Sequence, residues 1–274
     1  MTSWQSSVDN GMDWSVASHL ILESEVSLLV ITDYAQVVKF EATDRDYFTR
    51  REKFASDLGA IDLWSVMDQW PLYVGQVNLA RSLAIIELLR STLHVPGDVA
   101  EFGCWHGSTT MLIAKSLRIF DPLSPKRIHV FDSFEGLTEF NDSDIAARGQ
   151  RGSYRGSREA LLCCAELAGV KDDLEIHEGL IENTLPKFSE SHRETRFSFV
   201  YCDTDLYGAT KTILAHAWGL VSRGGLMIFD QWNMAEYPGE GVAVNEFVEA
   251  YEAEIEVFKP SFTRQPTLAL RRVT

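Results

Sequence analysis

Features that mark several other classes of protein are scarce in this sequence. Only four cysteines stand among the 274 residues (Cys104, Cys163, Cys164 and Cys202), with no C-x-x-C pair. Because two of them are adjacent, reduced thiols are expected rather than a disulfide framework. The apolar runs, such as Leu28–Ile31, are too short to cross a bilayer, and the first residues lack the basic and apolar regions of a leader. These absences predict a cytoplasmic protein without a membrane-spanning segment.

Positive charge is also in short supply. Lys and Arg number 25 against 40 Asp and Glu, which gives a formal net charge of −15. Nucleic acids and anionic membrane surfaces attract basic proteins, so neither is expected as a partner, and a solvated acidic surface accounts for the charge. The hydrophobic fraction of 45% is ordinary for a globular protein, and the length fits one large domain or one domain with an extension.

The first 70 residues contain no motif that carries chemistry. Trp64, Met67 and Trp70 recur at helical spacing, which indicates helices that pack onto another surface. We predict a helical N-terminal extension over residues 1–70 that covers a site or joins copies of the chain in a homo-oligomer. Residues 71–274 form the second predicted domain.

Strand and helix patterns alternate five times after the extension. Helices are expected at Gly75–Leu93, Ser108–Ile119, Ser157–Ala168, Thr210–Leu220 and Val242–Tyr251. The strands after the first are expected at Arg127–Asp132, Leu174–Glu178, Arg196–Asp203, Leu226–Asp230, Glu254–Lys259 and Thr267–Arg272. Continuously apolar strands that alternate with helices predict an α/β, doubly wound, mostly parallel seven-stranded sheet. The last two strands have no room for a crossover helix, so they form an antiparallel C-terminal hairpin.

The stretch Asp98–Thr109 predicts a binding platform. A buried strand ends there, and Gly103 and Gly107 permit a tight turn with close backbone approach. Ser108 and Thr109 offer oxygens to cap the helix that follows. In a doubly wound sheet, such a helix N-terminus faces the crevice in which ligands bind.

Carboxylates occur at the ends of four predicted strands: Glu101, Asp132, Asp203 and Asp230. The carboxyl ends of parallel strands line one crevice. Asp132 suits both hydroxyls of a ribose, with the capping of a helix as the alternative. Glu101 has two open roles, holding an ammonium group or supporting the glycine turn.

Asp203, Asp205, Asp230 and Gln231 form a second group of polar residues. Oxygen ligands from two adjacent strand ends suit Mg²⁺, which would orient a substrate diol and lower the pKa of its hydroxyl. Asp205 is then free to accept the proton. The alternative is that these aspartates cap helices.

Five segments in order carry a family resemblance: P-G-D-V-A-E-F-G-C-W-H-G-S-T, H-V-F-D-S-F-E-G-L, E-G-L-I-E-N-T-L-P, C-D-T-D-L-Y and G-G-L-M-I-F-D-Q-W. From about Pro71 to the C-terminus, the chain resembles the macrocin O-methyltransferase family, class I S-adenosylmethionine-dependent enzymes that methylate sugars of natural products. The resemblance implies a Rossmann-like fold, S-adenosylmethionine as cofactor, and Mg²⁺ that presents a sugar diol.

The resemblance also implies roles for individual residues. Asp203 and Asp205 fall on catalytic positions, with Asp205 as the general base. Asp203, Asp230 and Gln231 fall on metal positions. The positions that would bind S-adenosylmethionine are Tyr73, Val74, Glu101, Gly103, Cys104, Trp105, Gly107, Ser108, Thr109, Asp132, Ser133, Phe134, Gly179 and Leu180.

One residue departs from the family pattern. The family usually shows Asp-Asp after the fifth strand, and this chain has Asp230-Gln231. A glutamine carbonyl still ligates a hard cation, but the site loses one negative charge, so the affinity for Mg²⁺ falls. Dependence on metal therefore stays open, and without metal Asp203 or Asp205 acts as an ordinary base on a positioned hydroxyl.

These observations predict an S-adenosylmethionine-dependent O-methyltransferase. Its acceptor is expected to be a small natural product: a deoxysugar or other glycoside, a nucleotide sugar, or a polyketide. Two alternatives stay open, an enzyme of the same fold associated with hydroxylation and a non-catalytic S-adenosylmethionine-binding protein. A nicotinamide dehydrogenase fits poorly because the turn lacks a full G-x-G-x-x-G.

Overall fold

The computed structural model describes residue 45 and residues 63–274 of the chain. This part contains a seven-stranded sheet in the order β3-β2-β1-β4-β5-β7-β6. The strands are β1 (Asp98–Phe102), β2 (Ile128–Asp132), β3 (Leu174–Glu178), β4 (Phe197–Cys202), β5 (Val221–Phe229), β6 (Ile255–Phe258) and β7 (Leu268–Arg272). β1 to β5 pair in parallel, whereas β7 runs antiparallel between β5 and β6. The predicted mostly parallel sheet with an antiparallel C-terminal pair is confirmed.

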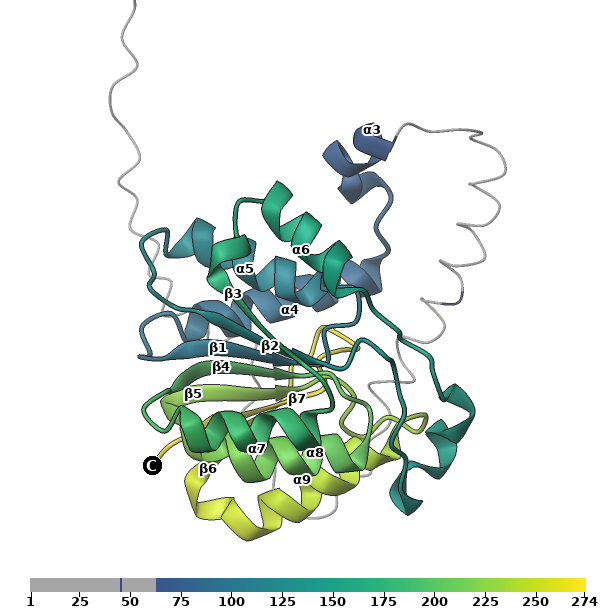
Figure 1. Cartoon of the computed structure of the whole chain (residues 1–274), viewed down its shortest axis with the longest axis vertical. Helices are drawn as coiled ribbons and strands as arrows, with labels where there is room; N and C mark the ends of the chain where they lie inside the picture. The colour runs from purple at the N-terminus through teal and green to yellow at the C-terminus, as the bar shows by residue number, and fades with distance from the viewer. Residues whose placement is uncertain (1–44, 46–62) are drawn as a thin grey trace, which may run out of the picture.

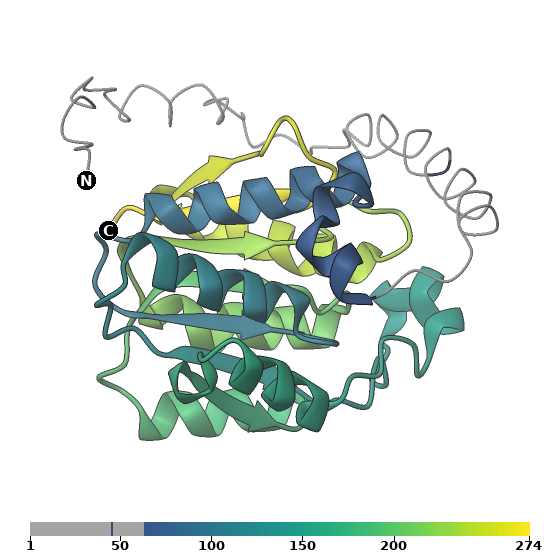
Figure 2. The same ribbon diagram turned by 90° about the horizontal axis from the view of Figure 1, so that it is seen from above.

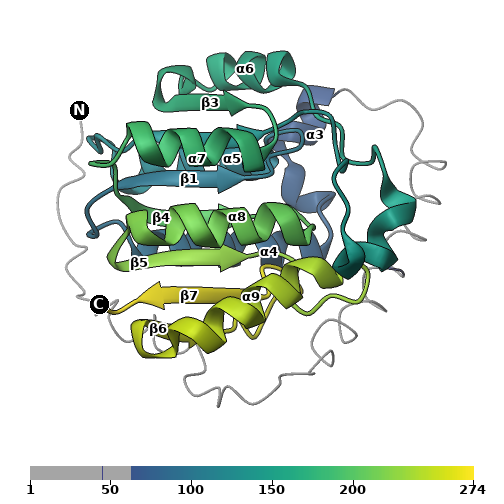
Figure 3. The ribbon, with the colours of Figure 1, turned by 60° about the horizontal axis from the view of Figure 1, so that its bottom comes forward.

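Helices cover both faces of the sheet (Figures 1 and 3). They are α3 (Leu63–Asp68), α4 (Gln76–Ser91), α5 (Ser108–Phe120), α6 (Arg158–Leu167), α7 (Ile181–Ser191), α8 (Tyr207–Ala217) and α9 (Pro238–Tyr251). α4, α5 and α6 lie on one face and α7, α8 and α9 on the other. Short 3₁₀ segments include η1 (Trp70–Leu72) and η2 (Asp142–Gln150). The two layers leave the carboxyl ends of the parallel strands at one edge, on the side of η2 (Figure 3).

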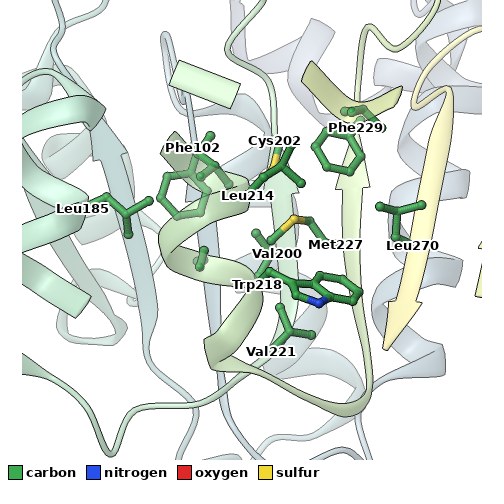
Figure 4. Close-up of a cluster of buried hydrophobic side chains, with 14 of the residues drawn as sticks. Phe102, Leu185, Val200, Cys202, Leu214, Trp218, Val221, Met227, Phe229 and Leu270 are labelled. Atoms are coloured by element: carbon green, nitrogen blue, oxygen red, sulfur yellow. The ribbon is translucent and has the colours of Figure 1, made fainter. Parts of the chain in front are cut away.

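Each face of the sheet has its own apolar core. Figure 4 shows the core beneath α7 and α8, where Phe102, Val200 and Met227 of the sheet meet Leu185 and Leu214 of the helices. The opposite core includes side chains of α4, α5 and α6. Because fully burying one such side chain contributes about 1.5–3 kcal/mol, the central strands form a rigid base for the residues at their ends.

The structure corrects some local expectations. Gly107, at φ +81, is the N-cap of α5 and has no side-chain cap, so the expected capping by Ser108 and Thr109 is wrong. No helix was expected between β3 and β4, where the structure has α7 with Pro186 inside it. β5 starts at Val221, five residues before the expected strand.

The predicted N-terminal extension lies mostly outside the described residues. Its described end contains α3 and η1, with Met67, Trp70 and Leu72 exposed. The domain boundary and the covering role therefore stay predictions. In the described part of the chain, every helix falls short of the length and apolarity needed to cross a bilayer.

Candidate active site

Three of the four predicted strand-end carboxylates lie in one row, with Gly103 at the end of β1 between them. Phe131, Phe102, Cys202 and Phe229 are register partners on four neighbouring strands. The residues that follow them are Asp132, Gly103, Asp203 and Asp230. Backbone bonds continue the ladder one step further, since the Asp203 N–H donates to Phe102 and the Asp230 N–H to Cys202. The predicted crevice residues are thus brought together at one edge of the sheet.

Two glycines are required by the turn that leaves β1. Gly103 has φ +82, and a Cβ there would lie 2.0 Å from the carbonyl oxygen of Asp203. Gly107 has φ +81, and its Cβ would lie 2.3 Å from a methyl group of Leu161 on α6. The turn therefore brings the backbone of β1 directly against β4, as the glycine pattern predicts.

Asp132 holds this turn through its carboxylate. Oδ2 accepts the backbone N–H groups of Cys104 at 2.6 Å and Trp105 at 2.9 Å, and Oδ1 accepts that of Phe134 at 2.7 Å. All three donors lie outside helices, so the helix-capping alternative for Asp132 is wrong. The structure gives Asp132 a turn-holding role, and its expected contact with ribose hydroxyls stays a prediction.

Glu101 is a buried carboxyl group beside the turn. Oε2 accepts the hydroxyl of Thr110, while Oε1 is buried and has no hydrogen-bond partner within the described residues. Burial raises the pKa of Glu101 to about 8, although the Thr110 hydroxyl acts in the opposite direction. Both open roles remain compatible with this arrangement, since one oxygen braces α5 and the other is left for a donor.

Asp203 and Asp230 share a cation that the sequence did not indicate. The Arg81 guanidinium, from α4, contacts Asp203 Oδ2 at 2.9 Å through Nη2 and Asp230 Oδ1 at 3.1 Å through Nε. Its Nη1 donates to the Thr109 hydroxyl at 3.1 Å. Burial lowers the pKa of Arg81, but Asp230, Tyr201 and Asp203 outweigh it, so the pKa lies above its ordinary value.

The other oxygens of these two aspartates also accept hydrogen bonds. The side-chain amide of Gln231 donates to Asp203 Oδ1 at 2.5 Å and to Asp230 Oδ2 at 3.1 Å. Gln265 donates to Asp230 Oδ2 at 2.6 Å, and the Tyr201 hydroxyl donates to Asp230 Oδ1. All four carboxylate oxygens are therefore engaged by protein donors.

The donor set does not fit the Mg²⁺ that the family resemblance implied. Asp203, Asp230 and Gln231 do converge as predicted, but Gln231 turns its NH₂ group, not its carbonyl, toward the carboxylates. Arg81 already occupies the position between them. A divalent charge about 4 Å from a guanidinium is repelled by roughly 8 kcal/mol at an effective dielectric constant of 20. The prediction of these three residues as metal ligands is therefore not supported by their arrangement.

Asp205 lies beside this group in an unusual backbone conformation. It has φ +64, and its Oδ1 is buried without a hydrogen-bond partner within the described residues. Burial, together with Asp203 and Asp230, raises its pKa well above the ordinary value. Glu240, at the start of α9, is fully buried and accepts the backbone N–H of Gln231 at 2.7 Å. Both Glu240 and Arg81 were missed. Arg81 looks like an ordinary polar position of an amphipathic helix, and Glu240 precedes the expected helix Val242–Tyr251.

The remaining predicted residues border the same edge. Gly179 and Leu180 connect β3 to α7, and the Gly179 N–H donates to the Asp132 carbonyl at 2.9 Å. Tyr73 and Val74 follow η1 and are half-buried just ahead of α4. Ser133 directly follows Asp132, and its hydroxyl accepts the N–H of Glu135 at 3.2 Å.

Comparison with known proteins assigns the family. Residues 73–261 match the family model described as macrocin-O-methyltransferase (TylF). The chain belongs to the macrocin O-methyltransferase family. The match includes strands β1 to β6 and every residue predicted to bind the cofactor, to bind metal or to act in catalysis. The candidate site therefore lies within the part of the chain that matches the family.

Individual relatives are more distant. Mycinamicin III 3''-O-methyltransferase of Micromonospora griseorubida is 30% identical over 145 residues, which are 50% of this chain and 56% of that protein. Demethyldecarbamoylnovobiocin O-methyltransferase of Streptomyces niveus is 28% identical over 147 residues, 52% of this chain and 55% of that protein. The chain therefore spans about half the length of these curated relatives.

A solved structure confirms the fold over a longer range. CalS11, calicheamicin methyltransferase, aligns with a TM-score of 0.68 and 22% identity over 97% of this chain and 99% of that chain. This likeness supports the class I methyltransferase fold.

Proposed function

We propose that this chain is an S-adenosylmethionine-dependent O-methyltransferase that acts on a hydroxyl of a small natural product. The observation that carries the proposal is the row formed by Asp132, Gly103, Asp203 and Asp230 at one edge of the sheet. This row supports a cofactor site at the glycine turn, directly beside the carboxylates of Asp203 and Asp230. Family membership supports the same reaction class.

The residues around the glycine turn fit the cofactor. When bound, S-adenosylmethionine supplies an electrophilic methyl group that an acceptor oxygen takes by direct displacement. The backbone of Gly103 permits close approach, and the unpartnered Oε1 of Glu101 is an acceptor for an ammonium group. Asp132 keeps the turn in place and borders the ribose position. Tyr73, Val74, Gly179 and Leu180 complete the proposed set.

Asp205 is the proposed general base. Its buried, unpartnered Oδ1 is available for a hydroxyl proton, and because burial raises its pKa, the ionised form is a stronger base than an exposed aspartate. Asp203 holds its neighbours through Arg81 and Gln231, so its proposed role is to position the acceptor end of the site. A buried site with fixed donors gives rate mainly through orientation.

A deoxysugar is the proposed acceptor class. The named relatives act on mycinamicin III and demethyldecarbamoylnovobiocin, and CalS11 is also described as a TDP-rhamnose 3'-O-methyltransferase. Trp105 is 47% exposed and meets the ring of Tyr154 edge-on at 5.6 Å between centroids. The Tyr154 hydroxyl is 2.7 Å from that of Tyr237, just before α9. These aromatic surfaces near the strand ends suit a sugar ring.

A homo-oligomer in the cytoplasm belongs to the same proposal. Met67, Trp70 and Leu72 expose apolar surface at the start of the described chain, which supports contact with a second copy. The cysteines are free, which supports a reducing compartment. The negative net charge supports small-molecule acceptors over nucleic acid. Light scattering on the purified chain tests the oligomer: a monomer at micromolar concentration contradicts it.

A methyl-transfer assay tests the proposed function. TDP-rhamnose, mycinamicin III and demethyldecarbamoylnovobiocin serve as acceptors with labelled S-adenosylmethionine. Removing the base by Asp205→Asn is expected to lower kcat by about 10²–10⁴-fold. Asp203→Asn is expected to weaken turnover through lost positioning, and the exposed Asp172→Asn is the matched control with unchanged turnover. Near-normal turnover of both Asp203→Asn and Asp205→Asn would refute the assignment.

A further inference from the structure

The carboxylates of Asp203 and Asp230, at the ends of β4 and β5, are paired with a cation of the chain itself. Arg81 reaches it from α4, 122 residues before Asp203 and 149 before Asp230, and forms ion pairs with both at 2.9 and 3.1 Å. Asp230 is only 2% exposed. A guanidinium stays protonated under all ordinary conditions, so this positive charge is permanent.

The orientation of Gln231 agrees with a site built for that guanidinium. Both of its neighbours on the NH₂ side are carboxylates, which only accept hydrogen bonds when ionised, so the nitrogen must face them. A metal site would require the reverse orientation, with the carbonyl oxygen inward. That oxygen, Oε1, is buried and has no hydrogen-bond partner within the described residues. Gln231 therefore completes a network around Arg81 and leaves one acceptor for another molecule.

We propose that Arg81 replaces a divalent metal ion in this chain, serving as the fixed cation that holds Asp203 and Asp230 and faces the acceptor hydroxyl. The inference rests on the proposed methyltransferase function and names how its acceptor end works. Methyl transfer then needs no metal.

The side chains of Arg81, Gln231 and Asp205 leave one donor and two acceptors for a bound hydroxyl. Three of the five N–H bonds of Arg81 donate to Asp230, Thr109 and Asp203, one from each nitrogen, so one Nη1 hydrogen is left for an acceptor oxygen. The unpartnered oxygens of Gln231 and Asp205 are the complementary acceptors. Arg81 stabilises negative charge that develops on the acceptor oxygen, and Asp205 takes its proton. The electron pair of that oxygen forms the new C–O bond as the methyl group leaves the sulfonium.

Binding of Mn²⁺, followed by calorimetry, tests the proposal without any acceptor. The wild-type chain is expected to show no Mn²⁺ site that depends on Asp203. The double variant Arg81→Met/Gln231→Asp removes the cation and adds a third carboxylate. It is expected to bind Mn²⁺ at least about tenfold more tightly than the wild-type chain does. Adding Asp203→Asn must remove it. This last control also subtracts any metal bound elsewhere, for example at His129, Glu175 and His177 on β2 and β3.

Matched variants keep the test decisive. The control Arg90→Met/Gln231→Asp removes a different arginine of α4, in its last turn, and keeps Arg81. It is expected to bind no Mn²⁺ at Asp203. The single variant Gln231→Asp is also expected to bind no Mn²⁺ at Asp203. It replaces the double variant as the test if a melting curve shows that the Arg81 variant does not fold. An Asp203-dependent Mn²⁺ site in the wild type or in Gln231→Asp would overturn the proposal. A folded Arg81→Met/Gln231→Asp variant without such a site would also overturn it.

Turnover gives a second readout. Activity of the wild type is expected to be unchanged by EDTA and by added Mg²⁺, and Arg81→Lys is expected to keep more activity than Arg81→Met because it retains a positive charge. Activity that EDTA abolishes and Mg²⁺ restores would contradict the proposal. Binding of S-adenosylmethionine, measured on the same wild-type sample, distinguishes failure of the proposed function from failure of the Arg81 proposal. No binding would contradict the proposed function. Normal binding together with an Asp203-dependent Mn²⁺ site would contradict only the role of Arg81.

Discussion

The two halves of the crevice are built in different ways. On the β1–β2 side, the carboxylate of Asp132 is held by backbone N–H groups of the glycine turn and of its own loop. On the β4–β5 side, Asp203 and Asp230 are held by side chains, chiefly Arg81 from α4 and Gln231. Backbone donors do not depend on the identity of the side chains, whereas side-chain donors depend on the residues that supply them. The proposed cofactor side therefore depends on the turn alone, and we call it the generic half, whereas the proposed acceptor side depends on particular side chains.

The largest effect is expected from a substitution in the glycine turn of the generic half. Gly103→Ala would place a Cβ 2.0 Å from the Asp203 carbonyl oxygen at φ +82. We expect a loss of about 3 kcal/mol or more in the free energy of unfolding, together with loss of S-adenosylmethionine binding. Gly149→Ala, where a Cβ would meet open space, is the matched control for urea denaturation. Equal stability of the two variants would show that the turn tolerates displacement.

A smaller effect is expected from Asp132→Asn. The amide keeps one acceptor oxygen and turns an NH₂ group toward backbone N–H donors, so at least one of the three N–H groups loses its partner. The expected cost is about 2 kcal/mol of unfolding free energy. Asp172→Asn, on the exposed segment before β3, controls for the loss of a charge. If Asp132→Asn weakens cofactor binding but leaves stability unchanged, Asp132 serves the ribose and not the turn.

The smallest effect is a pH dependence at Glu101. Its pKa in the folded chain, about 8, lies above its ordinary value of 4.5, so the folded state keeps a proton that the unfolded state has lost. Stability that this carboxyl contributes is complete below pH 4.5 and falls as the pH rises to about 8.

Glu101→Gln removes that titration. The stability of this variant relative to the wild type is expected to rise by about 1 kcal/mol between pH 6 and pH 7. Denaturation curves at the two pH values measure it, and parallel curves for variant and wild type would contradict the raised pKa. A large loss of cofactor affinity in the same variant favours the ammonium-binding role over support of the turn.

The same division explains what sequence reasoning predicted. Gly103, Asp132, Asp203 and Asp230 were expected at one edge because the strand pattern and the parallel order place strand ends together, and register confirms it. Arg81 was not expected, because its role depends on where the first turns of α4, which runs along the sheet (Figure 2), lie relative to the ends of β4 and β5. No local pattern contains that information.

The placement of Gln231 shows the same limit. Its position in the sequence predicted a metal-ligating carbonyl near Asp203, whereas the structure places its NH₂ group there, 2.5 Å from Asp203 Oδ1. The nitrogen faces inward because its two neighbours, Asp203 and Asp230, are carboxylates that accept hydrogen bonds, and no local sequence pattern shows that. α7 is a different case, because Pro186 disfavours a helix locally while Ile181, Leu185 and Phe188 bury the face that holds it.

The central claim is that cofactor and acceptor share the single row of strand ends. A crystal structure of the chain with S-adenosylhomocysteine tests it most directly. The account predicts the nucleoside beside Asp132 and the sulfur on the side of Asp203, with Arg81 still paired to both aspartates. A ligand bound away from the Gly103 turn, or a sulfur facing away from Asp203 and Asp205, would contradict it.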